Sequence, residues 1–255
     1  MALTLNDRVV IVTGAGSGIG RATAQLAAQH GAHVIVQDLS ETGADETTTL
    51  IQDAGGSATS IVGDVSDQTA VDETVELAQQ TGKLRGLVNN AGIMDNFAPA
   101  VRTTDEMWER ILRVNVNSVF KYTRAAVPHM IDNGGGAIVN LASAAGIRGA
   151  AAGAAYTASK HAVVGLTRNT AYVHANENVR VNAVAPGGVE TNVMASIDPA
   201  SYDAGAMEVT GPVHATAIRQ AHPDELAQLI VFLLSDEASN VSGAIIPADA
   251  GWHAG

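Results

Sequence analysis

The chain has 255 residues, 46% of them hydrophobic and none of them cysteine, and it carries a formal net charge of −12 with no cluster of lysine and arginine. This length suits one large α/β domain. The absence of cysteine excludes disulfides and cysteine-based metal sites. The eight histidines show no metal-ligand spacing, so we expect no bound metal. The negative charge disfavours nucleic acid and anionic membranes as partners, and because neither a membrane-spanning run nor a signal peptide is recognisable, we expect a cytoplasmic protein.

Short apolar runs alternate with amphipathic stretches from one end of the chain to the other. The runs are rich in valine, isoleucine and leucine and do not alternate with polar residues, as is typical of strands buried on both faces of a parallel sheet. We therefore predict one α/β domain over residues 1–255 with a Rossmann fold, a doubly wound, seven-stranded parallel sheet with helices on both faces. The expected strands are 8–13, 33–37, 58–62, 84–89, 136–141, 180–185 and 244–247, and the expected helices are 18–30, 41–54, 68–81, 105–132 (long enough for two helices), 155–176 and 223–235.

The segment 192–222 has no clear hydrophobic period and contains Pro199, Gly205, Gly211 and Pro212. An irregular segment of this length in a compact domain is usually functional, and we expect a lid over a substrate site. A disordered insertion is the alternative that the sequence leaves open.

Glycines cluster in residues 13–20, directly after the first expected strand and at the start of the first expected helix. Glycine lets the backbone approach a pyrophosphate closely, and a helix N-terminus offers free amides and the positive end of the helix dipole. Because the cluster lies between a strand and a helix, as the dinucleotide-binding fingerprint requires, it predicts a nucleotide site.

Asp38 ends the second expected strand, eighteen residues after Gly20. A carboxylate at this place can accept hydrogen bonds from both hydroxyls of the adenosine ribose, and it repels a 2′-phosphate. No arginine or lysine lies in the glycine loop before Gly18 or directly after Asp38, so we expect NAD rather than NADP as the cofactor. The alternative is that Asp38 only caps the helix that begins near Ser40.

Two further segments end strands at the edge of the sheet where open α/β sheets bind ligands. Asp64 closes the third expected strand and can accept a hydrogen bond from an adenine amino group, with the capping of a turn as the alternative. Asn90 and Gly92 follow the fourth strand, and they either form a backbone wall beside the ribose or simply make a turn.

Tyr156 and Lys160 are four residues apart, so both lie on one face of a helix, and Ser143 precedes Tyr156 by thirteen residues. A phenol with a pKa of about 10 is a poor proton donor or acceptor at neutral pH. We expect the ammonium of Lys160 to favour the phenolate and to lower the pKa of Tyr156. The Ser143 hydroxyl can polarise the same substrate oxygen.

Together these segments resemble the short-chain dehydrogenase/reductase family, in the family's order and spacing over nearly the whole chain. The resemblance implies the predicted fold, an oxidoreductase activity with a nicotinamide cofactor, and a homotetramer. The matching pieces are the glycine loop 13–20, Asp64, the segment 89–92, Asn115, Ser143, Tyr156, Lys160, and Pro186, Gly187 and Thr191.

The resemblance also implies a role for each matched side chain. Tyr156 would be the general acid/base, Ser143 would hold the substrate oxygen, and Lys160 would bind the nicotinamide ribose. Asn115 would anchor a water in a proton relay, and an amide that bridges a kink in a long helix is a compatible interpretation. The residues expected to contact NAD are Gly14, Ser17, Gly18, Ile19, Gly20, Asp38, Leu39, Asp64, Val65, Asn90, Ala91, Gly92, Tyr156, Lys160, Pro186, Gly187, Val189 and Thr191.

Small residues between Ser143 and Tyr156 leave space for a ligand or allow helices of neighbouring subunits to pack closely, and we favour the first interpretation. Methionine can line an adaptable apolar pocket, although core packing is its commoner place. The residues expected to contact substrate are Ser143, Ala144, Ala145, Gly153, Met94, Gly187 and Met194.

We therefore expect an NAD-dependent enzyme that interconverts an apolar or cyclic secondary alcohol and its ketone by hydride transfer. A 3-oxoacyl-carrier-protein reductase shares the fold and the catalytic positions, but it needs NADPH and a basic docking surface, and the segments 129–136 and 172–178 contain no lysine or arginine. A non-catalytic NAD-binding sensor is a third alternative, and the complete catalytic set argues against it.

Overall fold

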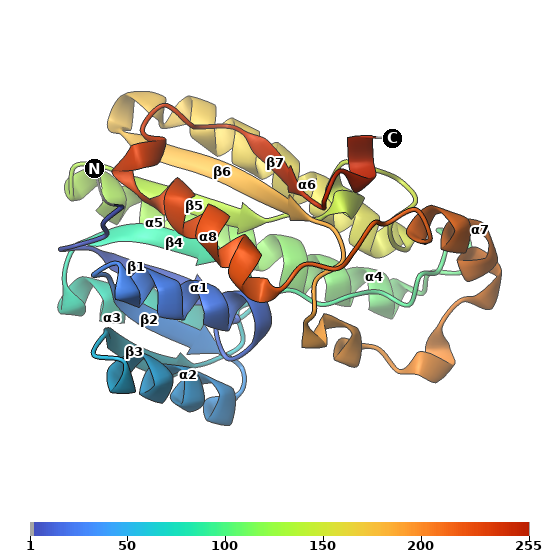
Figure 1. Cartoon of the computed structure of the whole chain (residues 1–255), viewed down its shortest axis with the longest axis horizontal. Helices are drawn as coiled ribbons and strands as arrows, with labels where there is room; N and C mark the ends of the chain where they lie inside the picture. The colour runs from blue at the N-terminus through green and yellow to red at the C-terminus, as the bar shows by residue number, and fades with distance from the viewer. Residues whose placement is uncertain (1–2, 255) are drawn as a thin grey trace.

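The computed structural model describes residues 3–254, and its strands form one seven-stranded sheet in the order β3-β2-β1-β4-β5-β6-β7 (Figure 1). Every neighbouring pair of strands is parallel. The strand order reverses between β1 and β4, which opens the crevice where such sheets bind ligands. The strands are β1 (Val9–Thr13), β2 (His33–Asp38), β3 (Ser57–Val62), β4 (Leu84–Asn89), β5 (Gly136–Leu141), β6 (Val179–Pro186) and β7 (Ile245–Ala248).

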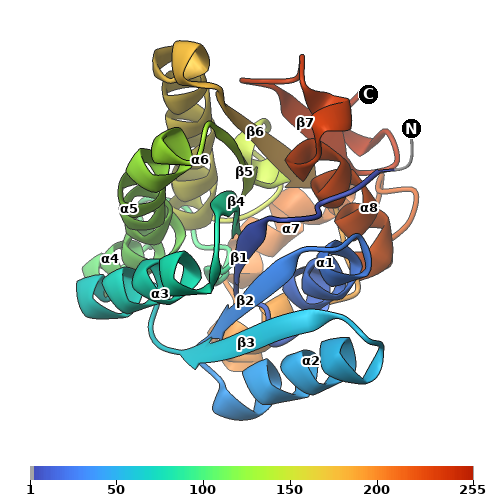
Figure 2. The same cartoon turned by 90° about the vertical axis from the view of Figure 1, so that its left-hand side faces the viewer.

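Helices cover both faces of the sheet, so the predicted doubly wound fold is confirmed (Figure 2). One face carries α1 (Gly18–Gln29), α2 (Glu41–Asp53) and α8 (Pro223–Leu234). The other face carries α3 (Gln68–Thr81), α4 (Asp105–Leu112), α5 (Ser118–Asp132) and α6 (Ala154–Val173).

The unbroken apolar runs of the strands are explained by these two helical layers. In β1, Val10 and Val12 belong to the core beneath α1 and α8, whereas Val9 and Ile11 belong to the core beneath α3 and α5. Successive side chains of a strand point to opposite faces, and because both faces are buried here, every position favours an apolar residue.

The helical stretch 105–132 is interrupted at its centre. It contains α4, a π-helical turn (Arg113–Asn117) and α5, in agreement with the possibility of two helices. The π turn contains the buried side chain of Asn115, and such turns often lie at functional sites.

The segment 192–222 contains regular structure, so the expectation that it lacks any is wrong. Two short 3₁₀ turns (Asn192–Ser196 and Pro199–Ser201) lead into α7 (Ala204–His214). The carboxylate of Asp203 caps α7 by accepting a hydrogen bond from the amide of Ala206 at 2.8 Å. The glycines and the proline that conceal the helical period in the sequence lie inside this helix.

Within residues 3–254, no helix is both long and apolar enough to cross a membrane. The same part of the chain contains no group of three or more histidine, aspartate or glutamate side chains arranged to hold a metal ion.

Candidate active site

The glycine loop turns sharply between β1 and α1. Gly14 and Gly18 have positive φ angles of 63° and 52°, which L side chains rarely adopt, and a Cβ on Gly20 would overlap the carbonyl oxygen of Gly14. Ser17 is the N-cap of α1 and makes no side-chain cap hydrogen bond, so the first-turn amides keep their capacity to bind a phosphate. The side chain of Ile19 packs against the core, which leaves its backbone for a cofactor.

The carboxylate of Asp38 braces this loop. Its Oδ2 accepts a hydrogen bond from the amide of Gly16 at 2.7 Å, and its Oδ1 accepts one from the amide of Ser40 at 2.9 Å. The cap of α2 is Ser40, whose hydroxyl accepts from the amide of Gly43 at 3.2 Å, so Asp38 is not the helix cap. The next side chain, Leu39, is 73% exposed beside the same corner.

A cation also lies at this corner. Arg21 donates from Nε to the hydroxyl of Thr47 at 2.9 Å, forms an ion pair with Glu46 at 2.8 Å, and donates to the carbonyl of Gly16. The prediction of the cofactor considered only the glycine loop and the residues after β2, and so missed this arginine. Its position directly after Gly20 is the signal that identifies it.

Asp64 makes the turn that follows β3. Its Oδ1 accepts hydrogen bonds from the amide of Ser66 at 2.8 Å and from the hydroxyl of Ser66 at 2.7 Å. Partial burial acts to raise the pKa of Asp64, but the Ser66 hydrogen bonds and the charges of Arg113 and Lys121 outweigh it and hold this pKa below its usual value. The carboxylate therefore caps this turn through Oδ1, and its hydrogen bond with an adenine amino group stays a prediction. The side chain of Val65 beside it is buried.

Asn90 ties the loop after β4 to the glycine loop. Its Nδ2 donates to the carbonyl oxygens of Thr13 at 2.9 Å and Gly14 at 3.0 Å. The hydroxyl of Thr13 accepts from the amides of Asn90 and Ala91 in return. These bonds hold two of the expected cofactor-binding segments in one fixed arrangement.

Asn115 links the π turn to the same loop. Its Oδ1 accepts from the amide of Ile93 at 2.9 Å, and its Nδ2 donates to the carbonyl of Ile93 at 2.9 Å and to the hydroxyl of Ser159 at 3.3 Å. A Cβ on Gly92 would lie 3.4 Å from Asn115 Oδ1 and 3.6 Å from Lys160 Nζ. The amide therefore joins the π turn to the loop after β4 and to α6, beside the lysine, rather than bridging the two halves of the interrupted helix. Its part in a proton relay stays a prediction.

Ser143, Tyr156 and Lys160 converge beyond the end of β5. The hydroxyl of Ser143 accepts from the amide of Ala145 at 3.1 Å, and it lies close enough to the phenol of Tyr156 to act on the pKa of that group. Lys160 Nζ donates to the carbonyl of Leu141 at 2.7 Å and lies 5.5 Å from the ring centroid of Tyr156. Both the phenol and the ammonium are buried.

The pKa of Tyr156 is raised, so the expected lowering by Lys160 is wrong for this structure. Burial raises the pKa of Tyr156 to about 12; the interaction with Ser143 acts to lower it and the negative charge of Asp95 raises it further. Burial also lowers the pKa of Lys160 to about 8. Because the ammonium is itself desolvated and is bound to a carbonyl, the sequence spacing alone overestimated its effect on the phenol.

The segment 187–191 closes the nucleotide crevice from the side of β6. A Cβ on Gly18 would lie 3.1 Å from the Thr191 methyl group, so this segment lies directly against the glycine loop. A Cβ on Gly187 would lie 2.8 Å from the Cβ of Asp249, so Gly187 is backed by the C-terminal segment. The wall expected for the nicotinamide is thus in contact with the phosphate-binding turn.

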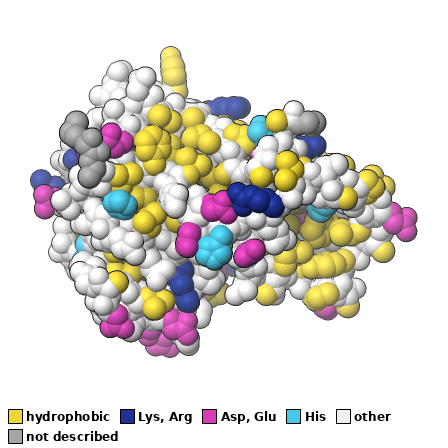
Figure 3. All heavy atoms as spheres, viewed as in Figure 1, with side chains coloured by type: hydrophobic (Ala, Val, Ile, Leu, Met, Phe, Trp, Pro, Cys, Tyr) yellow, Lys and Arg dark blue, Asp and Glu magenta, His cyan; other side chains and the backbone are white. Residues whose placement is uncertain are grey.

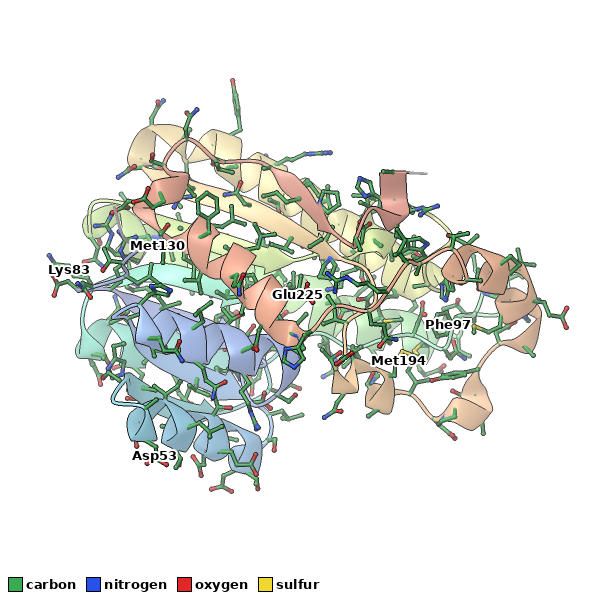
Figure 4. All side chains as sticks on the ribbon, viewed as in Figure 1. Asp53, Lys83, Phe97, Met130, Met194 and Glu225 are labelled. Atoms are coloured by element: carbon green, nitrogen blue, oxygen red, sulfur yellow. The ribbon has the colours of Figure 1, made fainter. Side chains whose placement is uncertain are left out.

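An apolar cluster surrounds Tyr156. Phe97 and Met194 both lie beyond the carboxyl ends of the strands, on the side of α7 (Figure 4). Met194 is 39% exposed, whereas Ala144 and Ala145 are fully buried. The buried members of the cluster are Met94, Phe97, Ala145, Ala152, Tyr156 and Ile197, with Ala151, Val193, Tyr202 and Met207 packed against them.

Asp95 is a residue of the site that the sequence prediction missed. Its carboxylate is 1% exposed and accepts hydrogen bonds from the amides of Gly153 at 3.1 Å and Tyr156 at 2.8 Å. A Cβ on Gly153 would lie 2.5 Å from Asp95 Oδ2, so that side of Gly153 is not open to a ligand, and a contact of its backbone with substrate stays a prediction. The space beside Gly153 is filled by the carboxylate.

The comparisons with known proteins agree with this arrangement. The family model described as Enoyl-(Acyl carrier protein) reductase matches residues 14–253. Short-chain dehydrogenase/reductase cdmF of Talaromyces verruculosus is 41% identical over 256 residues, which cover 97% of this chain and 98% of the relative. The chain belongs to the short-chain dehydrogenase/reductase family. It is therefore an oxidoreductase by family.

Two solved structures of similar chains differ in their cofactor. A short-chain dehydrogenase from Mycobacterium paratuberculosis bound to NAD has a TM-score of 0.91 and 31% identity, and the match covers 99% of this chain and 100% of the other. A Beutenbergia cavernae protein named as an NAD(P)-dependent gluconate 5-dehydrogenase, with bound NADP at low occupancy, has a TM-score of 0.85 and 40% identity, with 99% of each chain covered. Both share the fold of this chain.

Proposed function

We propose that this short-chain dehydrogenase/reductase interconverts a secondary alcohol and its ketone with NAD, and that Tyr156 is the general acid/base. The observation that carries the proposal is the convergence of Ser143, Tyr156 and Lys160 beside Asn115 and next to the glycine loop. A binding module has no need of a buried phenol, hydroxyl and ammonium around one apolar pocket.

The chemistry follows from the side chains. A bound nicotinamide supplies or accepts the hydride. Ser143 and Tyr156 donate hydrogen bonds to the carbonyl oxygen of a ketone, where negative charge grows in the transition state. With a pKa raised to about 12 by burial, the phenol of Tyr156 keeps its proton at neutral pH and can transfer it to that oxygen. Lys160 and Asn115 hold the path by which the proton is replaced.

The preference for NAD rests on Asp38. Its carboxylate lies at the end of β2 against Gly16, where it can accept hydrogen bonds from the adenosine ribose hydroxyls and would repel a 2′-phosphate. Arg21 lies nearby but is paired with Glu46, which reduces its capacity to bind a phosphate. The NADP bound to the Beutenbergia protein keeps NADP as the alternative that the assay must include.

The apolar cluster around Tyr156 supports an apolar or cyclic substrate, and we infer that the lid 192–222 covers it. Ile197 and Met207 of the lid pack against the same cluster as Met94 and Phe97. The description of the matching family model suggests an acyl-carrier-protein substrate. The segments 129–136 and 172–178 of this chain, however, contain no lysine or arginine to bind an acidic carrier protein.

We further infer a homotetramer, assembled through α5 and α6. Phe120 on α5 is 47% exposed, and Tyr172 and Val173 at the end of α6 are 86% and 58% exposed, so these helices carry apolar side chains on their outer surfaces. Sedimentation at micromolar concentration should show four copies, and a monomer alone would refute this assembly without touching the proposed chemistry.

The test of the function is a Tyr156→Phe variant assayed with NAD and NADP against secondary alcohols and against an acyl-carrier substrate. Loss of the proton donor should reduce turnover by roughly 10²–10⁴-fold, while NADH binding, measured by fluorescence, stays nearly unchanged. Tyr122→Phe is the matched control, because it removes another buried phenol whose burial also raises the pKa to about 12 and whose hydroxyl donates only to Thr74. Turnover that survives in Tyr156→Phe would refute the mechanism, and faster turnover of the acyl carrier with NADPH would refute the substrate class.

A further inference from the structure

The loop after β4 carries a buried carboxylate that the reaction scheme leaves without a role. Asp95 is 1% exposed, and its two oxygens accept hydrogen bonds from three backbone amides. Oδ1 accepts from Phe97 and Gly153, each at 3.1 Å, and Oδ2 accepts from Tyr156 at 2.8 Å. Among residues 3–254, no arginine, lysine or histidine forms an ion pair with it.

These bonds form a helix cap supplied from a distant part of the chain. Helices α2, α3 and α4 are capped by their own N-cap side chains, Ser40, Asp67 and Thr104. The N-cap of α6 is Gly153, which has no side chain, and the amides of the first turn bind the loop after β4 instead. Asp95 accepts from the N-cap amide and from the third helical amide, in the same places that a capping side chain would serve.

The rest of the loop completes this cap. The carbonyl of Ala98 accepts from the amide of Ala154 at 2.9 Å, so the segment 95–98 satisfies three amides at the start of α6, those of Gly153, Ala154 and Tyr156, that would otherwise lack partners. A Cβ on Gly153 would lie 2.5 Å from Asp95 Oδ2 and 2.6 Å from Oδ1. Only glycine at the N-cap lets the carboxylate approach this closely.

The same carboxylate also holds a wall of the substrate pocket. Phe97 is buried, although its φ angle of 64° lies in the left-handed region that a bulky side chain rarely adopts. Its amide donates to Asp95, and its ring packs edge-on against Tyr202 of the lid at 5.7 Å between centroids. Strain of this kind persists only where the surrounding contacts enforce it.

We propose that Asp95 is a positioning residue, which fixes the catalytic tyrosine on α6 and the pocket wall at Phe97 relative to each other. This inference rests on the proposed role of Tyr156. The Oδ2 atom of this carboxylate binds the amide of the tyrosine itself and so sets the depth at which the phenol meets Ser143. The other oxygen, Oδ1, binds the amide of Phe97, so one rigid carboxylate fixes both residues.

The charge of Asp95 gives the positioning an electrostatic consequence. Burial is the largest cause that raises the pKa of Tyr156, and the interaction with Ser143 acts to lower this pKa. The negative charge of Asp95 raises it further. The other titratable groups near the phenol are Lys160 on the same helix and Tyr202 and His214 on the lid side, which reach the pocket through Phe97. Replacing the carboxylate with an amide of equal shape should therefore lower the pKa of the phenol.

The experiment is the pH dependence of alcohol oxidation and ketone reduction in Asp95→Asn. Oxidation requires the phenolate, so the limb of the oxidation profile that rises with pH should move to lower pH by roughly one unit, and kcat should fall about tenfold through the weakened cap. KM for the ketone should rise because the wall at Phe97 is less firmly held. If kcat fell by the same factor at every pH and the rising limb did not move, Asp95 would be only a structural cap, and the proposal would be overturned.

Asp236→Asn is the matched control. It removes a carboxylate that is bound to Arg8 at the other end of the sheet, and it should leave the pH profile unchanged. If Asp95→Asn does not fold, amide hydrogen exchange of the unaltered protein tests whether Asp95 caps α6. The amides of Gly153 and Tyr156 should be strongly protected although they lie in the first turn of a helix, and rapid exchange there would refute the cap. An active Tyr156→Phe variant would refute the proposed function; an inactive one beside an unmoved Asp95→Asn profile would refute this inference alone.

Discussion

The nucleotide crevice and the lid differ in how their side chains are held. In the crevice, Asp38 binds the amide of Gly16 and Asn90 binds the carbonyl of Gly14, so polar groups from separate strands hold one another. In the lid, Val209 and Ile218 are 75% and 74% exposed. Hydrophobic side chains spread over this end of the molecule, on the right of Figure 3.

The segment 192–222 is attached by hydrogen bonds to several other segments, and Ile197, Tyr202 and Met207 pack in the apolar cluster around Tyr156. Arg102 donates to the carboxylate of Asp203 at 2.6 and 2.8 Å, the indole of Trp252 donates to the carbonyl of Val213 at 3.0 Å, and an isolated bridge joins Val189 to residue 221. Segments with much exposed surface open at lower free energy than buried ones. We therefore expect the proposed cofactor site to be more rigid than the segment 192–222, which we propose as an adaptable substrate cover.

The largest expected effect distinguishes two glycines. In Gly20→Ala, the new methyl group would overlap the carbonyl of Gly14 in the crevice, whereas in Gly211→Ala it would meet nothing within 4 Å in α7. We expect NADH affinity to fall more than about 100-fold in the first variant, because a displaced loop loses several phosphate contacts at once. The second variant should bind NADH normally. Its free energy of unfolding should change by less than about 1 kcal/mol, because the helix propensity gained with alanine is opposed by the contact of its Cβ with the following Pro212. Equal effects on NADH titration would contradict the distinction between the two regions.

A smaller effect is expected at Asp38. Asp38→Asn weakens the bond to the Gly16 amide and removes the charge that opposes a 2′-phosphate, so KM for NAD should rise roughly 10- to 100-fold while KM for NADP falls. Asp45→Asn is the control, since that carboxylate is exposed on α2 and accepts only from the hydroxyl of Ser60. Unchanged cofactor preference in Asp38→Asn would show that Arg21, and not the carboxylate, determines it.

The contrast also explains what the sequence could predict. Strands such as β1 are buried on both faces, so local composition determines them, and the glycine loop is recognisable because its contacts lie within one strand–turn–helix unit. In α7, Gly205, Gly211 and Pro212 conceal the helical period, because the helix depends on the Asp203 cap and its tertiary setting.

Predictions failed where distant residues determine the chemistry. The pKa of Tyr156 depends on burial and on Asp95, which is 61 residues away in the chain, and not on the spacing to Lys160 alone. The small size of Gly153 suggested room for a ligand, but the space is filled by the same carboxylate. Contacts between residues so far apart in the sequence form only when the sheet is assembled, and no local sequence pattern predicts them.

The smallest expected effect is confined to the lid. In Asp203→Asn, the amide can still cap α7, so the change removes mainly the ion pair with Arg102 at the point where the lid meets the loop after β4. Nearby, the amide of Asp203 donates to the carbonyl of Asn96, next to the wall residue Phe97. We expect KM for the alcohol to rise roughly two- to fivefold, with KM for NAD unchanged and faster proteolytic cleavage within 192–222.

The matched variant is again Asp236→Asn, which removes a carboxylate from an arginine pair far from the lid. It should alter neither KM nor the cleavage pattern. If Asp203→Asn changed KM for NAD as strongly as KM for the alcohol, the lid and the crevice would have to move as one body. The adaptable cover would then be excluded, because a loosened ion pair in an independent lid cannot reach the bonds that join Asp38 and Asn90 to the glycine loop.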